Sequence, residues 1–444
     1  MHDDQITIDP RHVTLAQHLD ARGTRSCGIY TGWFLAAAYG FDRGFEHYSS
    51  AMAPSPLADR ALAESLSEGG EDAWWASDVR TATSWSDVSS GRAVDLALEW
   101  LETVEANERI HLFLHLFDPH HDYIPPSPYD ERFDPEYRGA IDGRSWWSNS
   151  RVWDPRETPS RRISDRDLEH VQALYRGEIA WCDEQIGRLL SALESMGRME
   201  NTLFVITSDH GEEFFEHGNR GHRQTLYEEV LRIPLLVVPP VGESETRVPR
   251  SGALASLADI LPTVLDYVGG PSPLHVWGRS LRPAIEGGTT PDRLVTASLG
   301  LLGVTREGRQ SLAMLEAFHD GNEKLIRRVR LDPDGTASTV EAVEHYDIES
   351  DSGESRATDP LKARALWERA EALQEELRVF ASKLPRSAAA ERRTEARSVF
   401  SVELAELGYA EGELPEIERL RGVRWPSSPL RPLKWDPRLV QSGR

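Results

Sequence analysis

Cysteine is scarce in this sequence, since the chain of 444 residues contains two, Cys27 and Cys182. Two cysteines cannot build the disulfide framework that supports many small secreted domains. The sequence also has no apolar run of 18 residues, so we expect no transmembrane helix. Its first ten residues, MHDDQITIDP, are acidic and polar rather than basic and then apolar, which is unlike a signal peptide. Taken together, these absences predict a cytoplasmic protein.

Positive charge is also in short supply. The chain has 50 Lys and Arg residues against 73 Asp and Glu, for a formal net charge of −23. This balance argues against nucleic acid and anionic membranes as partners. An acidic protein that acts on an anionic ester needs a local positive centre such as a metal ion.

The order of apolar segments predicts an α/β fold. The apolar run Ile110–Phe117 predicts a strand buried on both faces of a parallel sheet. A helix with Ser164 as its N-cap and Gly197 as its stop precedes a second strand at Thr202–Thr207. Strand, helix and strand in this order indicate a doubly wound, parallel-rich sheet sandwiched by helices, and a strand at Leu235–Val238 is expected to extend it.

Both ends of the chain add further elements. Residues 13–48 predict a helix ended by Gly23, a strand and a loop. Beyond a helix at about 256–268, residues 290–350 resemble short strands of a small antiparallel sheet, and a helix is expected at 361–381. We therefore expect an α/β catalytic domain, a smaller sheet with a C-terminal helix, and a charged linker with an irregular tail, at residues 1–285, 286–382 and 383–444.

Polar clusters follow two of the predicted strands. The first is Asp118-Pro119-His120-His121-Asp122-Tyr123, and the second is Ser208-Asp209-His210-Gly211-Glu212-Glu213. In an open parallel sheet the ligand crevice lies outside the carboxyl ends of the strands, so we expect both clusters to face one site. Adjacent Asp and His offer a hard oxygen and an imidazole nitrogen to a divalent ion. Gly211 allows a sharp turn next to these groups.

Two more histidines extend the second cluster. His217 and His222 stand in a glycine-containing loop, where a histidine can stabilise a leaving-group oxygen or act as a general acid. For His217, an ordinary histidine of an exposed loop explains the sequence equally well.

These motifs resemble the sulfatase family of the alkaline phosphatase superfamily. TSDHGEEFFEHG (Thr207–Gly218) and GHRQTLYEEVLRIPLLVVPP (Gly221–Pro240) resemble the stretch where a strand ends in Ser-Asp-His-Gly or Ser-Asp-Asn-Gly and a later Tyr-Glu-Glu leads into Arg-Val-Pro-Leu. FLHLFDPHHDY (Phe113–Tyr123) resembles the Pro-His-x-Pro-Tyr element, although Asp122 stands where the family usually has Pro.

The likeness continues in order from about residue 13 to residue 409. Its other elements are a helix before the metal strand, an Asp-x-x-Pro-Thr helix, a Gly-x-Ser-Leu turn, a Tyr-Asp-Leu element and a Leu-Gly-Tyr element, at Leu174–Leu190, Ser256–Gly269, Trp277–Leu281, Tyr346–Glu349 and Glu406–Tyr409.

The resemblance implies a function and roles for four residues. Asp209 and His210 match two metal ligands, which in sulfatases normally bind Ca²⁺, with Zn²⁺ or Mn²⁺ as alternatives. His120 matches the histidine that contacts the ester. His222 lies near the place where many members have a lysine that contacts the sulfate. The implied reaction is metal-dependent hydrolysis of a small-molecule or sugar sulfate ester.

The sequence departs from the family at its beginning. A family member starts with a strand that ends in paired metal-binding Asp residues, followed by Cys-x-Pro-x-Arg or its Ser equivalent, and neither motif occurs here. No strand is predicted before Asp3 and Asp4, and Cys27 and Cys182 stand in other contexts and are expected to be structural. We therefore expect that the nucleophile segment is absent and that this chain alone does not turn over sulfate esters.

Two other functions are compatible with the sequence. A phosphodiesterase or phosphoethanolamine transferase of the same superfamily would use a Thr nucleophile and two zinc ions. An inactive truncated relative would survive as a binding module.

Overall fold

The computed structural model describes residues 8, 12–32, 35–52, 89–144, 146, 152, 162–241, 250–270, 276–304, 310–331, 338–356 and 360–383. The expectations for Asp3 and Asp4, for Glu406–Tyr409 and for the tail beyond residue 383 lie outside these residues. The described chain forms two compact units that divide between Met199 and Glu200, and we call them the N-terminal and C-terminal units.

The N-terminal unit contains a parallel sheet, as the sequence predicts. Its strands are β1 (Arg25–Tyr30), β2 (His47–Ser50) and β3 (Ile110–Leu114), in the order β2-β1-β3. Helix α1 (Leu15–Asp20) precedes β1, and a capping box between Thr14 and Gln17 starts it. A short 3-10 helix, η2 (Ala37–Tyr39), lies between β1 and β2.

Strand β3 differs from its prediction. It is five residues long, its side chains are half-buried rather than buried, and Phe113 is 38% exposed. The buried strand of this sheet is the central β1, whose residues from Ser26 to Tyr30 are all buried, including Cys27. An apolar run identifies a strand but not its position in the sheet, which explains the error.

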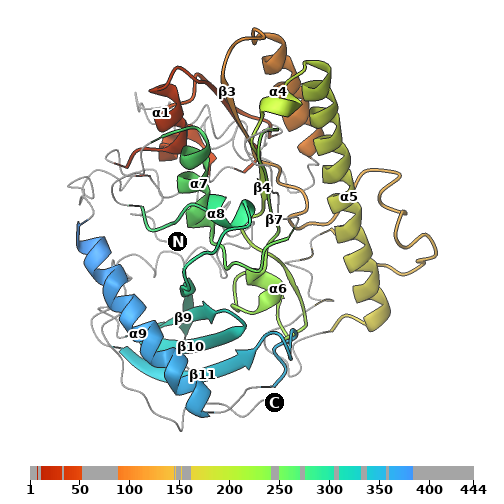
Figure 1. The fold of residues 1–444 in the computed structure, drawn as a ribbon. Coiled ribbons are helices and arrows are strands. Elements are labelled where there is room, and N and C mark those ends of the chain that lie inside the picture. The colour runs from red at the N-terminus through yellow and green to blue at the C-terminus, as the bar shows by residue number, and fades with distance from the viewer. Residues whose placement is uncertain are drawn as a thin grey trace, which may run out of the picture. The chain divides into compact units, whose positions relative to one another are not determined.

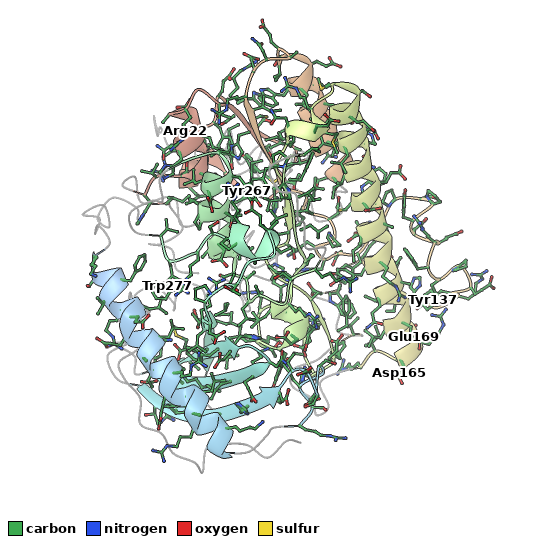
Figure 2. All side chains as sticks on the ribbon, in the orientation of Figure 1. Arg22, Tyr137, Asp165, Glu169, Tyr267 and Trp277 are labelled. Carbon is green, nitrogen blue, oxygen red and sulfur yellow. The ribbon has the colours of Figure 1, made fainter. Side chains whose placement is uncertain are left out.

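Two helices dominate the rest of the N-terminal unit. Helix α4 (Ser90–Glu102) packs against α5 (Asp165–Ser195) (Figure 1). The predicted N-cap of α5 is confirmed, because the Ser164 hydroxyl accepts a hydrogen bond from the Asp167 amide at 3.1 Å. The ring of Tyr137 stacks on His170 with centroids 3.6 Å apart, which holds part of the segment before α5 against its first turns. Figure 2 labels Tyr137 near Asp165 and Glu169 of these turns.

The C-terminal unit begins with two strands that run in opposite directions. Strand β4 (Phe204–Thr207) follows the 3-10 helix η3 (Met199–Asn201) and pairs antiparallel with β7 (Leu235–Val238). Our expectation that the strand at Leu235–Val238 extends the parallel pattern is therefore wrong. The chain between them forms a small hairpin and the single-turn helix α6 (Glu228–Leu231) instead of a crossover helix, and only a crossover returns a strand in parallel. The hairpin strands are β5 (Glu213–Phe214) and β6 (Arg220–Gly221).

The helix expected near residues 256–268 is also present. It starts as the 3-10 helix η4 (Leu257–Asp259), continues as α7 (Ile260–Tyr267) and is followed by α8 (Arg282–Ile285). The buried carboxylate of Asp259 accepts hydrogen bonds from the Arg279 amide and from the Arg293 guanidinium, which fixes this region internally.

A four-stranded antiparallel sheet and one long helix complete the C-terminal unit, as predicted. The sheet has the order β11-β10-β9-β8, and helix α9 (Pro360–Lys383) packs on it around Phe318, Leu325 and Trp367 (Figure 1). The strands β8 to β11 span Val295–Val304, Gln310–Asp320, Glu323–Leu331 and Ser338–Asp347. The predicted fold class is thus confirmed. Among the described residues, no helix is long and apolar enough to cross a bilayer.

Candidate active site

The turn after β4 carries Asp209 and His210 and is pressed against α6. The amide of Gly211 donates to the Val230 carbonyl at 2.7 Å, and the amide of Glu212 donates to the Glu229 carbonyl at 2.9 Å. A Cβ atom on Gly211 would lie 2.0 Å from the Glu229 carbonyl oxygen. The close backbone approach therefore requires glycine at this position, and it fixes the two residues that precede it.

His210 is oriented by its own chain. Its Nδ1 lies 2.9 Å from the Gly211 carbonyl oxygen, and because a carbonyl only accepts, Nδ1 carries the proton. The other ring nitrogen, Nε2, lies 3.6 Å from Oδ2 of Asp209, whose side chain is 77% exposed. These two atoms could both bind one divalent ion, since such ions hold nitrogen and oxygen ligands at about 2.0–2.6 Å and the atoms are 3.6 Å apart.

His222 stacks directly on His210. The two ring centroids are 3.7 Å apart and the planes differ by 19°. Nδ1 of His222 lies 3.0 Å from Oε2 of Glu212, and both side chains are about 5% exposed or less. Burial, followed by the charges of His210 and Arg223, lowers the pKa of His222 to about 3. A neutral His222 therefore donates its Nδ1 proton to the Glu212 carboxylate.

The donors around these rings suit a divalent ion. His210, Glu212 and His222 each offer one ligand atom, and these atoms lie within 4.8 Å of one another. Asp209 adds a carboxylate beside His210. Imidazole is a common ligand of zinc and other transition metals, whereas calcium prefers oxygen, so this mixed set accommodates several ions.

A second set of potential ligands, formed by Glu213, His217 and Glu229, is occupied by internal hydrogen bonds. The buried Glu213 carboxylate accepts from the His217 and Asn219 amides and from the Thr225 hydroxyl. Nδ1 of His217 lies 2.6 Å from Glu229, and its Nε2 lies 3.4 Å from the Glu354 carbonyl. These contacts tie the loop between β5 and β6 to its surroundings and give His217 a structural role.

His120 belongs to the N-terminal unit, on the loop that follows β3. It is half-buried, and its Nδ1 donates to the His121 carbonyl at 2.8 Å. Its ring packs against Phe117 with centroids 4.4 Å apart and against His121 at 4.2 Å. Like His210 and His222, it has its Nδ1 proton fixed by an oxygen acceptor.

The structure thus brings together three of the four predicted site residues, Asp209, His210 and His222. His120 lies in the other compact unit. Sequence reasoning gave no role to Glu212, the partner of His222. Glu212 contacts His222, whereas Glu213 holds the loop through Thr225. The sequence does not distinguish these two neighbouring glutamates, because only the folded hairpin directs them to different partners.

A family model described as Sulfatase matches residues 5–270, which is more than half of the chain. The chain belongs to the sulfatase family. Among curated sulfatases, rat (Rattus norvegicus) arylsulfatase K is 27% identical over 210 residues, which covers 43% of this chain and 36% of the relative. N-acetylglucosamine-6-O-sulfatase of Bacteroides thetaiotaomicron is 39% identical over 118 residues, or 26% of this chain and 21% of the relative. The matches therefore span about a third or less of the length of these relatives.

Solved structures agree with the sulfatase fold. A protein solved in complex with its substrate D-glucosamine-2-N,6-O-disulfate has a TM-score of 0.58 and 19% identity, and the match covers 88% of this chain and 86% of that one. The phosphonate monoester hydrolase of Agrobacterium radiobacter has a TM-score of 0.54 and 19% identity, over 83% and 81% of the two chains. At this identity the likeness concerns the fold.

Proposed function

We propose that this sulfatase-family chain binds the sulfate group of a sugar or small-molecule ester beside a divalent metal ion and takes part in its hydrolysis. The observation that supports the proposal is the stacked pair of His210 and His222 at the end of β4. Each ring has its Nδ1 proton fixed, by Gly211 and by Glu212, so Nε2 is the nitrogen directed to ligands in both.

Asp209 and His210 are the proposed metal ligands. The resemblance favours Ca²⁺, while the imidazole donor makes Zn²⁺ and Mn²⁺ alternatives. A bound ion would supply positive charge to the sulfate oxygens, which an acidic protein needs.

His222 is proposed to contact an ester oxygen as an imidazolium, through a second proton on Nε2 that the ring takes up when the anionic ester binds. A neutral ring with its proton on Nδ1 could only accept at Nε2, as the ester oxygen does. Glu212 fixes the orientation of the ring, and when Nε2 is also protonated the carboxylate balances the charge of the imidazolium. This arrangement is suited to stabilising negative charge on an oxygen as the sulfur–oxygen bond breaks.

His120 is proposed as a second contact of the ester. Its Nδ1 proton is engaged by the His121 carbonyl, so Nε2 is the contacting nitrogen, and it donates to an ester oxygen when the ring carries a second proton there. In a complete enzyme that contains this chain and hydrolyses the ester, replacing His120 or His222 by alanine should lower kcat/KM by about a hundredfold. This is the usual scale for one acid–base or charge-stabilising group.

Calorimetry with calcium, manganese and zinc chlorides tests the metal proposal. Asp209→Ala should weaken the preferred ion at least tenfold, since even outer-sphere changes cost about 10–100-fold in metal affinity. Asp292→Ala is the control, because Asp292 is an exposed aspartate of the same unit. Identical titrations of the wild type and Asp209→Ala would remove Asp209 from the metal site.

The ester is tested separately, with 4-nitrophenyl sulfate and bis(4-nitrophenyl) phosphate as probes. Binding or turnover of the sulfate ester that depends on His222 supports the proposal. A response to the phosphodiester alone would assign the chain to a different activity of the superfamily.

A further inference from the structure

The loop that carries His120 is attached at both ends to one face of helix α5. The loop runs from Asp118 to Ile124, and the two helix residues that hold it are Glu178 and Cys182. Residues four apart on a helix lie on the same face, one turn from each other, so a single rigid surface holds both ends.

The first end is fixed through the backbone and side chain of Asp118. The buried Cys182 thiol donates to the Asp118 carbonyl at 3.0 Å. The Asp118 carboxylate accepts from the Ser90 amide at 2.9 Å and from the Ser90 hydroxyl, at the start of α4. Burial and the charge of Asp118 raise the pKa of Cys182 to about 12, so the thiol keeps the proton that it donates.

The second end is fixed by Glu178. Its Oε1 accepts a hydrogen bond of 2.7 Å from the Ile124 amide, while the residue is 2% exposed. Next to it, a Cβ atom on Gly177 would lie 2.6 Å from the Tyr129 carbonyl oxygen, so the chain beyond the loop runs directly against the helix. The contact of helix and loop is therefore close on both sides of Glu178.

The surroundings of Glu178 disfavour a negative charge. Within the described part of the chain, its Oε2 has no hydrogen-bond partner. The titratable groups that face it are the carboxyl groups of Asp118 and Asp122 on the loop and the thiol of Cys182 on its own helix. Burial, with Asp118 and then Asp122 adding to it, raises the pKa of Glu178 well above its usual value.

We propose that Glu178 and Cys182 are positioning residues for His120, and that Glu178 holds the loop as a neutral carboxylic acid. The inference rests on the proposed ester contact of His120. A neutral carboxyl group accepts from the Ile124 amide without adding a third buried negative charge beside two aspartates. The Ile124 hydrogen bond by itself favours the ionised form, but burial and the two aspartates outweigh it. Ionisation of Glu178 would place a third negative charge beside the two aspartates and repel the loop that carries them, so the position of His120 becomes sensitive to rising pH.

Nuclear magnetic resonance of histidine labelled with nitrogen-15 tests the inference, with His120 assigned by its loss in His120→Gln. In the wild type, Nδ1 of His120 should give a protonated signal and Nε2 an unprotonated one above the pH at which the ring is neutral. Glu178→Gln should keep this pattern, because the carboxamide keeps the acceptor oxygen and has N–H groups in place of the acid O–H. Glu178→Ala should move both signals toward the tautomer average, while Glu194→Ala, at an exposed position of the same helix, should not.

The pH dependence separates positioning from simple support of the fold. As the pH is raised, the wild type should lose the His120 pattern when Glu178 ionises, whereas Glu178→Gln should retain it. Loss at the same pH in both proteins would overturn the inference, and so would a wild-type pattern in a folded Glu178→Ala. If the alanine variant does not fold, the comparison of wild type and Gln decides alone.

Titration with inorganic sulfate distinguishes this inference from the proposed function. The Glu178→Ala variant should bind sulfate about tenfold or more weakly, since one hydrogen bond to a charged group is worth about ten- to a hundredfold in affinity. If sulfate leaves the wild-type His120 signals unmoved, the ester contact is wrong. The tautomer comparison still tests whether Glu178 positions the ring.

Discussion

The three histidines proposed for the site share one arrangement at the scale of single residues. Nδ1 of His120, His210 and His222 meets an oxygen acceptor, which is a backbone carbonyl in two cases and the Glu212 carboxylate in the third. Fixing one nitrogen decides which nitrogen is left to contact a ligand. His217 differs, because Glu229 and the Glu354 carbonyl engage both of its nitrogens.

The protonation of His217 should make stability depend on pH. Burial lowers the pKa of His217, but the hydrogen bond and charge of Glu229 outweigh it and the pKa is raised above 6.5. A raised folded-state pKa gives stability that is full below the unfolded value and is lost as the pH rises through the folded value. Replacing His217 by Gln should therefore reduce the free energy of unfolding more at about pH 6 than at about pH 9.

Urea denaturation of both proteins at the two pH values measures this difference. Groups near His217 that also titrate are Glu213, Glu216 and Glu354, whose pKa values are raised mainly by burial, and this main contribution is common to both proteins. An equal loss at both pH values would mean that folding does not raise the pKa of His217.

At the scale of elements, the turn between β4 and the following hairpin is held by backbone contacts to α6. Gly211→Ala would place a methyl group 2.0 Å from the Glu229 carbonyl oxygen, so the turn must move. We expect a loss of about 1–3 kcal/mol in the free energy of unfolding, the usual cost of overpacking. We also expect weaker metal binding, because His210 moves with the turn.

Gly187→Ala provides the matched control for this change. Gly187 lies inside α5, and a Cβ atom there would meet nothing within 4 Å. Alanine should stabilise the helix by about 0.5–1 kcal/mol. Thermal or urea unfolding of both variants shows whether each change lowers or raises the free energy of unfolding. A Gly211→Ala protein as stable as the wild type would show that the turn can rearrange.

Elements with strong periodicity were predictable from the sequence. Ser164 and Gly197 bracket α5 as expected, and Gly197 adopts the left-handed conformation with φ of 67°. The direction of β7 was not predictable from its apolar residues, because the sign of a pairing depends on the connection. The sequence also predicted that Asp209 and His210 lie together at the end of a strand. It did not predict the contact of Glu212 with His222, which forms only when the hairpin folds back.

Charge balance is the dominant feature at the scale of the whole molecule. With a net charge of −23, like charges repel across the folded chain, and salt screens this repulsion. Raising sodium chloride from about 0.02 M to about 0.2 M shortens the screening length roughly threefold and should raise the unfolding midpoint. A gain of about 1 kcal/mol corresponds to about 2–4 °C.

Differential scanning calorimetry with sodium and potassium chloride tests the screening account. The two salts should give equal shifts, because screening depends on ionic strength and not on the cation. A midpoint that stays constant or falls would mean that favourable ion pairs outweigh the excess of acidic residues.

The two cysteines are both enclosed in the N-terminal unit, with Cys27 on the central strand and Cys182 against the loop of His120. Burial raises the pKa of each thiol to about 12, so alkylating reagents, which attack the thiolate, have almost nothing to react with in the folded state. Alkylation must then wait for an opening of the structure. The rate at which the mass increases under excess reagent consequently measures how often the N-terminal unit opens. A peptide map after digestion shows whether Cys27 on the central strand or Cys182 on α5 was alkylated.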